Sequence, residues 1–293
     1  TRKGRCYWLK CYEIPEGDKN FKGRAIQNML NIEPDDSVNA MLRLRGLNDE
    51  EFVNSHYVVF ATKNGTIKKT CLEAYSRPRT NGVNAINIVE GDEVVDVRLT
   101  NGKNEIILAN RNGRAVRFDE NTVRSMGRVS TGVRGMQLDG DDDQVVGMII
   151  VNNAETETVM VVSENGYGKR SQVEDYRKTN RGGKGVKTFS ITDKTGRLVA
   201  IKNVTDDNDL MIINKSGIAI RLAVSDCRVM GRATQGVRLI NLSKKNDVIA
   251  SVCKVMSSEL EAKLADDNSA TEPEATEATE ATEAKETNPE NEK

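Results

Sequence analysis

The sequence of 293 residues is poor in the side chains that most enzyme sites and most thick hydrophobic cores use. Phe, Trp and Tyr make up 4% of the chain, and His56 is its one histidine. The five cysteines (Cys6, Cys11, Cys71, Cys227 and Cys253) form no Cys-x-x-Cys pair. One histidine and scattered thiols do not make a zinc site, and no serine or cysteine has a partner base. We therefore expect neither catalytic residues nor a metal or other cofactor in this chain.

Loops for nucleotides and segments for membranes are missing as well. There is no Walker loop, no G-x-G-x-x-G after a strand, no apolar run near 18 residues and no signal peptide. These absences favour reduced thiols and a cytoplasmic protein. The chain begins at Thr1 inside a strand-like pattern, so we expect an N-terminally truncated fragment whose first structural unit is incomplete.

The net charge of −1 hides a strong segregation of charge. Residues 257–293 carry 12 acidic and 3 basic side chains, a net of −9, which leaves about +8 on residues 1–256. The repetitive stretch ATEATEATEAKET has almost nothing apolar to bury, which predicts disorder. We expect a folded basic domain over 1–256 and a disordered acidic tail over 257–293. The tail either improves solubility or competes with an acidic ligand for the basic domain.

What the sequence does contain is a repeat. MGRVSTGVRGMQL (126–138) returns as MGRATQGVRLINL (230–242), and TNRGGKGVKTFSI (179–191) is a copy between them. The turn glycines Gly65, Gly113, Gly166 and Gly217 are 48, 53 and 51 residues apart, so the unit is about 50 residues. The two most similar copies are therefore two units apart.

Each unit reads as four short strands. The first strands are expected at 57–62, 105–110, 158–163 and 209–214, and each leads into an x-Gly hairpin turn and a second strand. Third strands are expected at 83–88, 133–138, 186–191 and 237–242, and fourth strands at 94–99, 145–150, 198–203 and 248–253. In the leading unit RCYWLKCYEI (5–14) is expected to be the second strand, with Trp8 and Tyr12 in the core.

Five repeats of four strands with almost no helix signal predict an all-β protein. We expect a β-pinwheel or propeller of four-stranded blades, with roughly five blades represented, because neighbouring sheets in a ring cover one another's faces. A linear β-solenoid is the alternative, but its coils repeat in fewer residues. The sequence Asp139–Asp143 looks like a calcium loop, but its glycine is misplaced, so we interpret it as a turn.

Basic residues recur at two fixed positions of the repeat. One set lies on the second strands: Lys68, Lys69, Arg114, Arg117, Lys169, Arg170 and Arg221. The other lies on the loops before the third strands: Lys22, Arg24, Arg77, Arg79, Arg124, Arg128, Arg134, Arg177, Lys178, Arg181, Lys184, Lys187, Arg228, Arg232 and Arg238. In a ring, equal phase means equal height and radius, so both sets would form one basic band around the rim.

Such a band suits duplex nucleic acid, bound through its phosphates without reading sequence and with steep salt dependence. The loop glycines would let the backbone approach the phosphates, and successive N–H groups would form anion nests. The scarcity of aromatic residues argues against a single-strand stacking platform. We therefore predict direct DNA contact for all the basic residues named above.

The motifs IPEG…KGRAIQNML, ATKNGTIKKT, NGRAVRF, VRSMGRVSTGVRGM, SENGYGKRS and VMGRATQGVRLI, in this order, resemble the C-terminal domain of the bacterial DNA gyrase A protein. The resemblance covers about residues 4–255. It implies a six-bladed β-pinwheel whose blades exchange a strand, and DNA wrapped around its perimeter for negative supercoiling. It also implies partners, the N-terminal region of the gyrase A protein and the gyrase B protein in an A2B2 heterotetramer, with ATP, magnesium and the catalytic residues outside this fragment.

One departure concerns the family's Q-R-R-G-G-K/R-G box, which lies in its first blade. Here Arg181–Gly185 matches the last five positions, but Thr179 and Asn180 replace the leading Gln and Arg. Arg181 and Lys184 therefore inherit a DNA-contact role only as equivalents in a later blade. Two alternatives stay open: the corresponding domain of topoisomerase IV, which wraps weakly, and a propeller that binds proteins.

Overall fold

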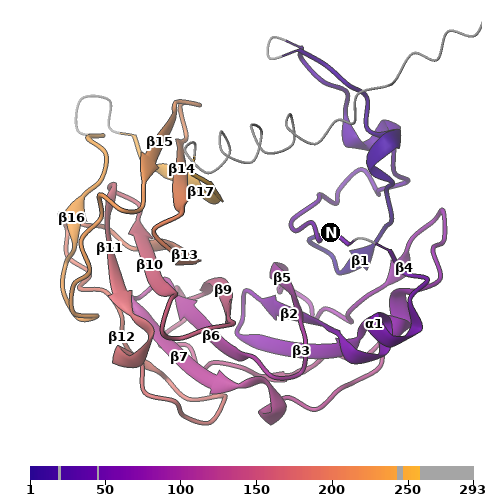
Figure 1. Ribbon diagram of the computed structural model, residues 1–293, viewed down its shortest axis with the longest axis horizontal. Helices are drawn as coiled ribbons and strands as arrows, with labels where there is room; N and C mark the ends of the chain where they lie inside the picture. Colours follow the sequence, from indigo (N-terminus) through magenta and orange to yellow (C-terminus); the bar gives the residue numbers. More distant parts are fainter. Residues whose placement is uncertain (19–20, 45, 243–246, 258–293) are drawn as a thin grey trace, which may run out of the picture. The chain divides into compact units, whose positions relative to one another are not determined.

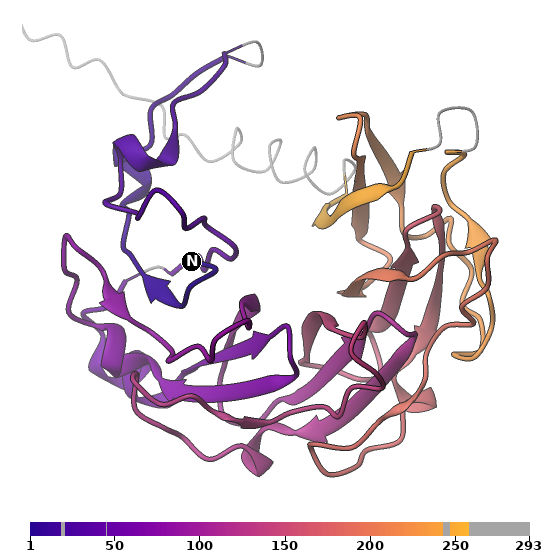
Figure 2. The ribbon, with the colours of Figure 1, turned by 180° about the vertical axis from the view of Figure 1, so that it is seen from behind.

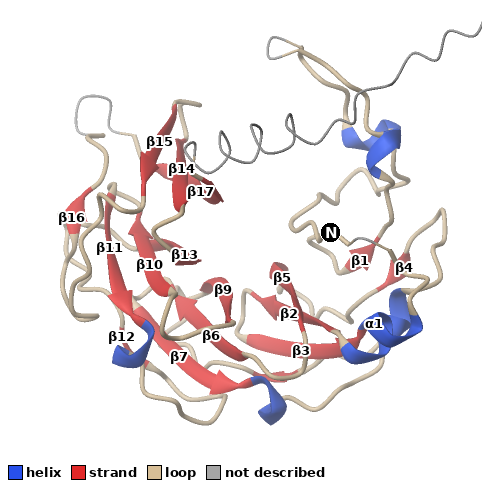
Figure 3. Cartoon of the chain, in the orientation of Figure 1, coloured by secondary structure: helices blue, strands red, loops and turns tan. Residues whose placement is uncertain are grey.

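Four sheets built on one plan follow one another along the chain in the computed structural model, which describes residues 1–18, 21–44, 46–242 and 247–257 (Figures 1 and 3). Blade 1 contains β2 (Tyr57–Thr62), β3 (Thr66–Cys71) and β5 (Val94–Thr100); blade 2 contains β6 (Glu105–Asn110), β7 (Arg114–Asp119) and β9 (Val145–Val151). Blade 3 contains β10 (Thr158–Ser163), β11 (Tyr167–Gln172) and β13 (Leu198–Val204); blade 4 contains β14 (Asn208–Asn214), β15 (Ala219–Ala223) and β17 (Ile249–Met256). Each blade has its first strand in the middle, between the fourth and the second.

The third strand of each unit belongs to the preceding sheet. β8 (Val133–Arg134) pairs with β3, β12 (Val186–Lys187) with β7, and β16 (Val237–Arg238) with β11, all antiparallel. In the same way β4 (Val83–Asn84) pairs with β1 (Arg5–Cys6) of the leading segment. This is the strand exchange that the family resemblance implies, and it corrects the simpler expectation of four consecutive strands in one blade.

The exchanged strands have two residues each, where six were predicted, because the chain then bends around the preceding hairpin. The backbone N–H groups of Gly135 and Met136 both donate to the carbonyl of Gly65, at 2.8 and 3.1 Å. Gly65 has a φ of +85°, and a Cβ there would lie 2.6 Å from the Met136 carbonyl oxygen. Only glycine satisfies both conditions, so the turn glycine serves the exchange as well as the hairpin.

Inner strands join the blades at the centre of the fold. β5, β9, β13 and β17 form the inner edges of the sheets, and β12 and β16 lie at outer edges (Figures 1 and 2). The N–H groups of Val94, Val145, Leu198 and Ile249 each donate to a carbonyl in the turn region of the preceding unit, at 2.9 to 3.0 Å. Each blade is therefore hydrogen-bonded to its neighbour at the inner edge and by strand exchange at the outer edge.

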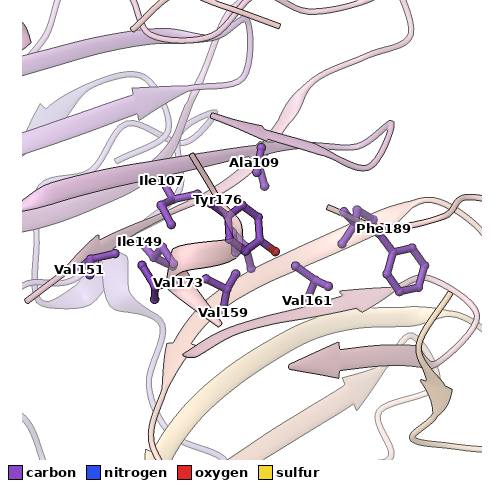
Figure 4. Close-up of a cluster of buried hydrophobic side chains, with 12 residues drawn as sticks. Ile107, Ala109, Ile149, Val151, Val159, Val161, Val173, Tyr176 and Phe189 are labelled. Atoms are coloured by element: carbon purple, nitrogen blue, oxygen red, sulfur yellow. The ribbon is translucent and has the colours of Figure 1, made fainter. Parts of the chain in front are cut away.

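The hydrophobic core lies between the blades. In the cluster between blades 2 and 3, Ile107 and Ala109 of β6 face Val159 and Val161 of β10, and Tyr176 packs among them (Figure 4). Equivalent clusters lie between the leading segment and blade 1, between blades 1 and 2, and between blades 3 and 4. A strand covered on both faces needs apolar residues at successive positions, which explains runs such as EIILAN and TVMVVS.

The helices among the described residues are short. Asp49 caps α1 (Glu50–Ser55), and its side chain accepts from the Phe52 N–H. The 3-10 helices of the described part of the chain are η1 (Cys11–Glu13), η2 (Ile26–Asn28), η3 (Leu72–Tyr75), η4 (Glu120–Thr122) and η5 (Val173–Asp175). The expected strand over residues 5–14 is wrong beyond Cys6. Tyr12 is 78% exposed instead of buried, whereas Trp8 packs against the core and donates to the Tyr75 carbonyl.

The all-β pinwheel prediction is confirmed over Thr1–Met256, which forms one compact unit. The predicted tail lies outside the described residues except for Ser257. No helix among the described residues is long and apolar enough to cross a membrane.

Candidate nucleic-acid interface

The basic loops occupy equivalent places on successive blades. After its second strand, each unit sends a loop back along the outer strand of the preceding blade. The N–H groups of Met126, Thr179 and Met230 donate to the carbonyls of Lys69, Arg117 and Arg170, each at 2.8 Å. The loops of blades 2, 3 and 4 are thus fixed in the same register on blades 1, 2 and 3.

The exchanged strands present a row of cations at these outer edges. Arg134, Lys187 and Arg238 are the second residues of β8, β12 and β16, and all three are exposed. They pair with the first residues of the strands that receive them, Thr66, Arg114 and Tyr167. Basic residues at the same position of the sequence repeat therefore occupy the same position on successive blades.

None of the basic loop residues is buried. Most make no side-chain hydrogen bond or ion pair within the part of the chain that the structure describes; these are Lys22, Arg24, Arg77, Arg79, Arg124, Arg128, Arg134, Arg177, Lys187, Arg228 and Arg238. Cations without internal partners on exposed loops are available to an external anion, and their spacing follows the blades.

Four basic loop residues have internal partners. Lys178 forms ion pairs with Glu105 at 3.0 Å and Asp119 at 3.2 Å, and Lys184 pairs with Asp139 at 3.4 Å. Arg181 donates to the carbonyls of Thr122 and Arg134, at 2.9 and 3.0 Å, and Arg232 donates to that of Lys187 at 2.6 Å. Arg181 and Arg232 thereby connect loops of neighbouring blades, and the outer surface is held as one continuous framework.

The strand-borne set requires a correction, because much of it is buried. Lys68, Lys69, Lys169 and Arg170 are 0%, 4%, 1% and 6% exposed. Lys69 lies 3.6 Å from Glu120, and Arg170 pairs with Asp206 at 2.7 Å while donating to the Val224 and Cys227 carbonyls. The prediction of direct contact is corrected for these four residues, since buried side chains are not open to an external phosphate.

The other three strand-borne residues are held by internal contacts but are less buried. Arg117 pairs with Glu105 at 2.5 Å, Arg221 pairs with Asp209 at 2.6 Å, and Arg114 donates to the Gly185 carbonyl at 3.2 Å. Arg117 also donates to the carbonyls of Val173 and Tyr176 in the next unit. Because these three side chains are engaged in contacts within the fold, the exposed loop residues form the candidate interface.

Three loop glycines lie close to the backbone of the preceding blade. Gly185 has a φ of +73°, and a Cβ there would lie 2.3 Å from the carbonyl oxygen of Ala115 on β7. Gly132 and Gly236 approach the carbonyls of Ile67 and Gly168 in the same way. These glycines therefore make a close backbone approach to the preceding blade, where the exchanged strand enters.

A central cavity and one acidic turn are two further places where a ligand could be sought. The inner ends of the blades line a cavity of about 410 Å³, where Arg2 and Lys63 both pair with Glu93, at 3.5 Å, and Arg111 pairs with Glu164 at 3.6 Å. No group of three or more His, Cys, Asp or Glu side chains suited to a metal ion occurs among the described residues. Asp139–Asp143 forms a turn in which Asp143 accepts from Asn110 and Asn112.

Sequence reasoning overlooked two buried tyrosines beneath the basic loops. Tyr75 is 4% exposed and Tyr176 is 0% exposed. Each stands seven residues after a buried lysine, Lys68 or Lys169, and this spacing is the signal that could have identified them.

Known proteins share this repeat and this arrangement. The model of the DNA gyrase C-terminal domain, described as a β-propeller, matches five times, over residues 1–45, 56–101, 104–152, 157–205 and 208–253. The DNA gyrase A protein of Staphylococcus aureus strain NCTC 8325 is 42% identical over 271 residues, which cover 92% of this chain and 30% of that protein. The chain thus spans about a third of the length of this relative.

Solved structures agree with the family match. The C-terminal domain of a DNA topoisomerase IV superposes with a TM-score of 0.78 and 26% identity, over 91% of this chain and 82% of its own length. A DNA gyrase A C-terminal domain shares the fold with a TM-score of 0.74 and 24% identity, over 87% of this chain and 80% of that one. With its five repeat matches, its exchanged strands and its basic outer loops, the chain belongs to the family of DNA gyrase C-terminal domains.

Proposed function

We propose that the basic loops and exchanged strands on the outer edges of the blades bind duplex DNA and wrap it around this domain. The observation that carries the proposal is the set of unpartnered cations at equivalent positions of successive blades. A duplex offers phosphates at regular spacing, and cations repeated at regular intervals match it without reading bases.

Curvature sets the energetic condition for wrapping. Bending a duplex smoothly through 40–90° costs on the order of 1–6 kcal/mol, so several phosphate contacts must offset this cost. The hydrogen bonds that fix the loops in register support the proposal, because loops already held in place lose little conformational entropy on binding. The outer edges carry few aromatic side chains, which favours duplex over single-stranded DNA.

As part of the same proposal, the domain belongs to a cytoplasmic gyrase in which the gyrase A and gyrase B proteins assemble as a heterotetramer. DNA cleavage and the use of ATP and magnesium are assigned to other parts of that assembly. This chain's contribution is to position a contiguous DNA segment for strand passage, so that supercoils of one sign accumulate.

Linking number tests the proposal directly. The chain is bound to a nicked circular plasmid, the nick is ligated, the protein is removed and the topoisomers are separated. A shift that grows with the protein-to-DNA ratio is expected for chiral wrapping. An unchanged topoisomer distribution at saturating protein would refute wrapping even if binding is tight.

The salt dependence of affinity tests the interface residues. The triple variant Arg134→Ala, Lys187→Ala, Arg238→Ala should lower the slope of log affinity against log salt by about 2 to 3, because each lost phosphate contact removes about 0.9. The triple variant Lys10→Ala, Lys103→Ala, Lys215→Ala, at exposed positions outside the exchanged strands and the basic loops, is the control. Equal slopes for the two variants would remove the exchanged strands from the interface.

The domain of topoisomerase IV is a second candidate because of the structural likeness to such a domain. That function predicts DNA binding with little or no shift in linking number. A protein-binding propeller predicts neither salt-sensitive DNA affinity nor a shift, so one set of experiments separates the three.

A further inference from the structure

The two MGR loops differ from the other basic loops in what lies beneath them. Lys68 and Lys169 each stand three residues after a turn glycine, and they are almost completely buried. At the equivalent positions blades 2 and 4 have Val116 and Ile220. The loop that begins MGR at 126 lies over Lys68, and the loop that begins MGR at 230 lies over Lys169. This feature therefore repeats every second blade, which explains the spacing of the two best-matched copies.

Lys68 is held beneath its loop without a carboxylate partner among the residues that the structure describes. Its ammonium donates to the carbonyl of Ala85 at 2.6 Å and to that of Arg128 in the loop. The Tyr75 hydroxyl donates to the same Ala85 carbonyl at 3.1 Å, and the Phe60 ring lies 5.6 Å away. The groups that face this ammonium are thus neutral or, in the case of the Arg128 guanidinium, of like charge.

Lys169 has an equivalent environment in blade 3. Its ammonium donates to the Gly231 carbonyl at 2.7 Å, in the second MGR loop. The Arg232 guanidinium is the nearby like charge, and it also lies near Tyr176, whose hydroxyl is hydrogen-bonded to Thr188. The exposed carboxylate of Asp175 is the one acidic group that acts on it, without forming an ion pair among the described residues.

Above each lysine the loop forms the same turn. Ser130 donates through both its N–H and its hydroxyl to the Gly127 carbonyl, and Thr234 does so to the Gly231 carbonyl. The backbone N–H groups of 127–129 and 231–233 donate no hydrogen bond within the described part of the chain. Successive free N–H groups beside an arginine form a cradle for an anion.

We propose that each of these two turns binds one backbone phosphate of the duplex, and that the buried lysine beneath it takes up a proton from the solvent as the phosphate binds. The inference rests on the proposed function, and it adds two defined phosphate sites on alternate blades and a linkage between DNA affinity and pH. Within the described part of the chain each site holds a lysine and an arginine without a paired acid. A bound phosphate supplies the missing negative charge.

The direction of the linkage follows from the burial of the two ammonium groups. Burial, with a contribution from Arg128, lowers the pKa of Lys68 to about 8. Burial also lowers the pKa of Lys169 to about 7; Asp175 opposes this shift and Arg232 adds to it. A phosphate nearby favours the charged form and raises both pKa values, so binding is accompanied by proton uptake above pH 7 and not at pH 6. Tyr75 and Tyr176 stay neutral in this range because burial raises the pKa of both, and burial likewise raises the pKa of Cys6, which also lies near Arg128, to about 11.

Calorimetry with a linear duplex in two buffers of different ionisation enthalpy counts the protons. At pH 7.5 we expect an uptake of up to about one proton per chain, about three-quarters from Lys169 and one-quarter from Lys68, and close to none at pH 6. Affinity should fall about tenfold or more between pH 7 and pH 9. Lys169→Val and Lys68→Val copy Val116 of blade 2 and should each remove their own share.

Lys187→Met is the matched control, because removal of this exposed lysine should lower DNA affinity and leave the number of protons taken up unchanged. A buffer-independent enthalpy at pH 7.5, with DNA still bound, overturns the inference and leaves the proposed function intact. Proton uptake that persists in the double variant Lys68→Val, Lys169→Val also overturns the inference, since other groups then take up the protons. If a valine variant fails to fold, the difference in uptake between pH 6 and 7.5 in the unaltered chain decides. If the unaltered chain binds no DNA at any pH tested, the proposed function itself is contradicted.

Discussion

A basic residue stands four positions after each turn glycine: Lys69, Arg117, Arg170 and Arg221. The first three donate hydrogen bonds to backbone carbonyls of the following unit. Lys69 donates to the Glu120 carbonyl at 3.1 Å, Arg117 to the Val173 carbonyl at 2.9 Å, and Arg170 to the Val224 carbonyl at 3.0 Å. Each accepting carbonyl lies at the start of the next loop. These side chains therefore fix the position at which the loop leaves its own blade and crosses to the preceding one.

Arg170→Met should destabilise the domain by about 2–4 kcal/mol, because it leaves the Val224 and Cys227 carbonyls and the Thr158 hydroxyl without their donor. Urea unfolding measures the change. Arg177→Ala is the control, since this exposed arginine has no side-chain partner in the described residues and should change stability by less than about 0.5 kcal/mol. Equal effects of the two substitutions would contradict the structural role of Arg170.

Lys169 also makes stability depend on pH. Its pKa falls from 10.5 in the unfolded chain to about 7 on folding, so the unfolded chain binds more protons between these values. Stability therefore rises with pH across this window, by on the order of 1–2 kcal/mol between pH 7 and 8.5 from this residue. Above about pH 9 Cys6 and Tyr176 act in the opposite direction, because burial raises their pKa values.

Lys169→Val should flatten this rise, and urea unfolding at pH 7 and 8.5 of both proteins measures it. Lys187→Val is the control, since it makes the same change of residue at an exposed position. The same slope in Lys169→Val as in the unaltered chain would show that the ammonium is not desolvated in solution.

The sequence pattern did not distinguish the exposed basic residues of the loops from the buried basic residues of the strands, and the reason is physical. In a half-exposed strand, alternation of residues shows which side chains face water. Strands such as β11 are covered on both faces, with four successive residues buried, so no alternation distinguishes Lys169 and Arg170 from surface residues. The loop residues carried no such ambiguity, and all of them are at least partly exposed.

At the scale of elements, strand exchange depends on glycines that leave room for a neighbouring backbone. Gly185→Ala should weaken the junction between β12 and β7, because its Cβ would meet the Ala115 carbonyl at 2.3 Å from a left-handed backbone conformation. We expect a loss of about 2 kcal/mol or more in urea unfolding. The neighbouring Gly183 has nothing closer than 3.9 Å to its Cβ position, so Gly183→Ala is the control and should change stability little. A Gly185→Ala protein as stable as the control would contradict this role of the glycine at the junction.

The repeat pattern largely predicted where the strands lie, but not to which sheet each third strand belongs; that came from the family resemblance. The β-branched runs and x-Gly turns predicted the first strands β2, β6 and β10 with their observed ends. A repeat of 50 residues, however, is equally consistent with a third strand in its own sheet or in the one before. The third strand joins the sheet whose outer edge its loop reaches. Backbone hydrogen bonds such as that from Gly135 to Gly65 determine this edge, and hydrophobic periodicity does not reveal them.

At the scale of the whole molecule, the separation of charge predicts an effect of the tail. Residues 257–293 carry a net charge of −9, against about +8 on the remainder. A segment of this charge attached to a basic domain raises the local concentration of carboxylates near the cations that we propose bind DNA. This competition is electrostatic, so it depends on ionic strength whatever the conformation of the tail.

A chain shortened to residues 1–256 should bind duplex DNA more tightly than the full chain at low salt. The difference should disappear as the screening length falls from about 30 Å at 0.01 M salt to about 8 Å at 0.15 M. Fluorescence anisotropy titrations across this range measure it. The matched control keeps the tail's length and replaces its Glu and Asp residues by Gln and Asn, which should reproduce the shortened chain if charge is the cause. Identical affinities of all three proteins at every salt concentration would leave the tail without a role in DNA binding.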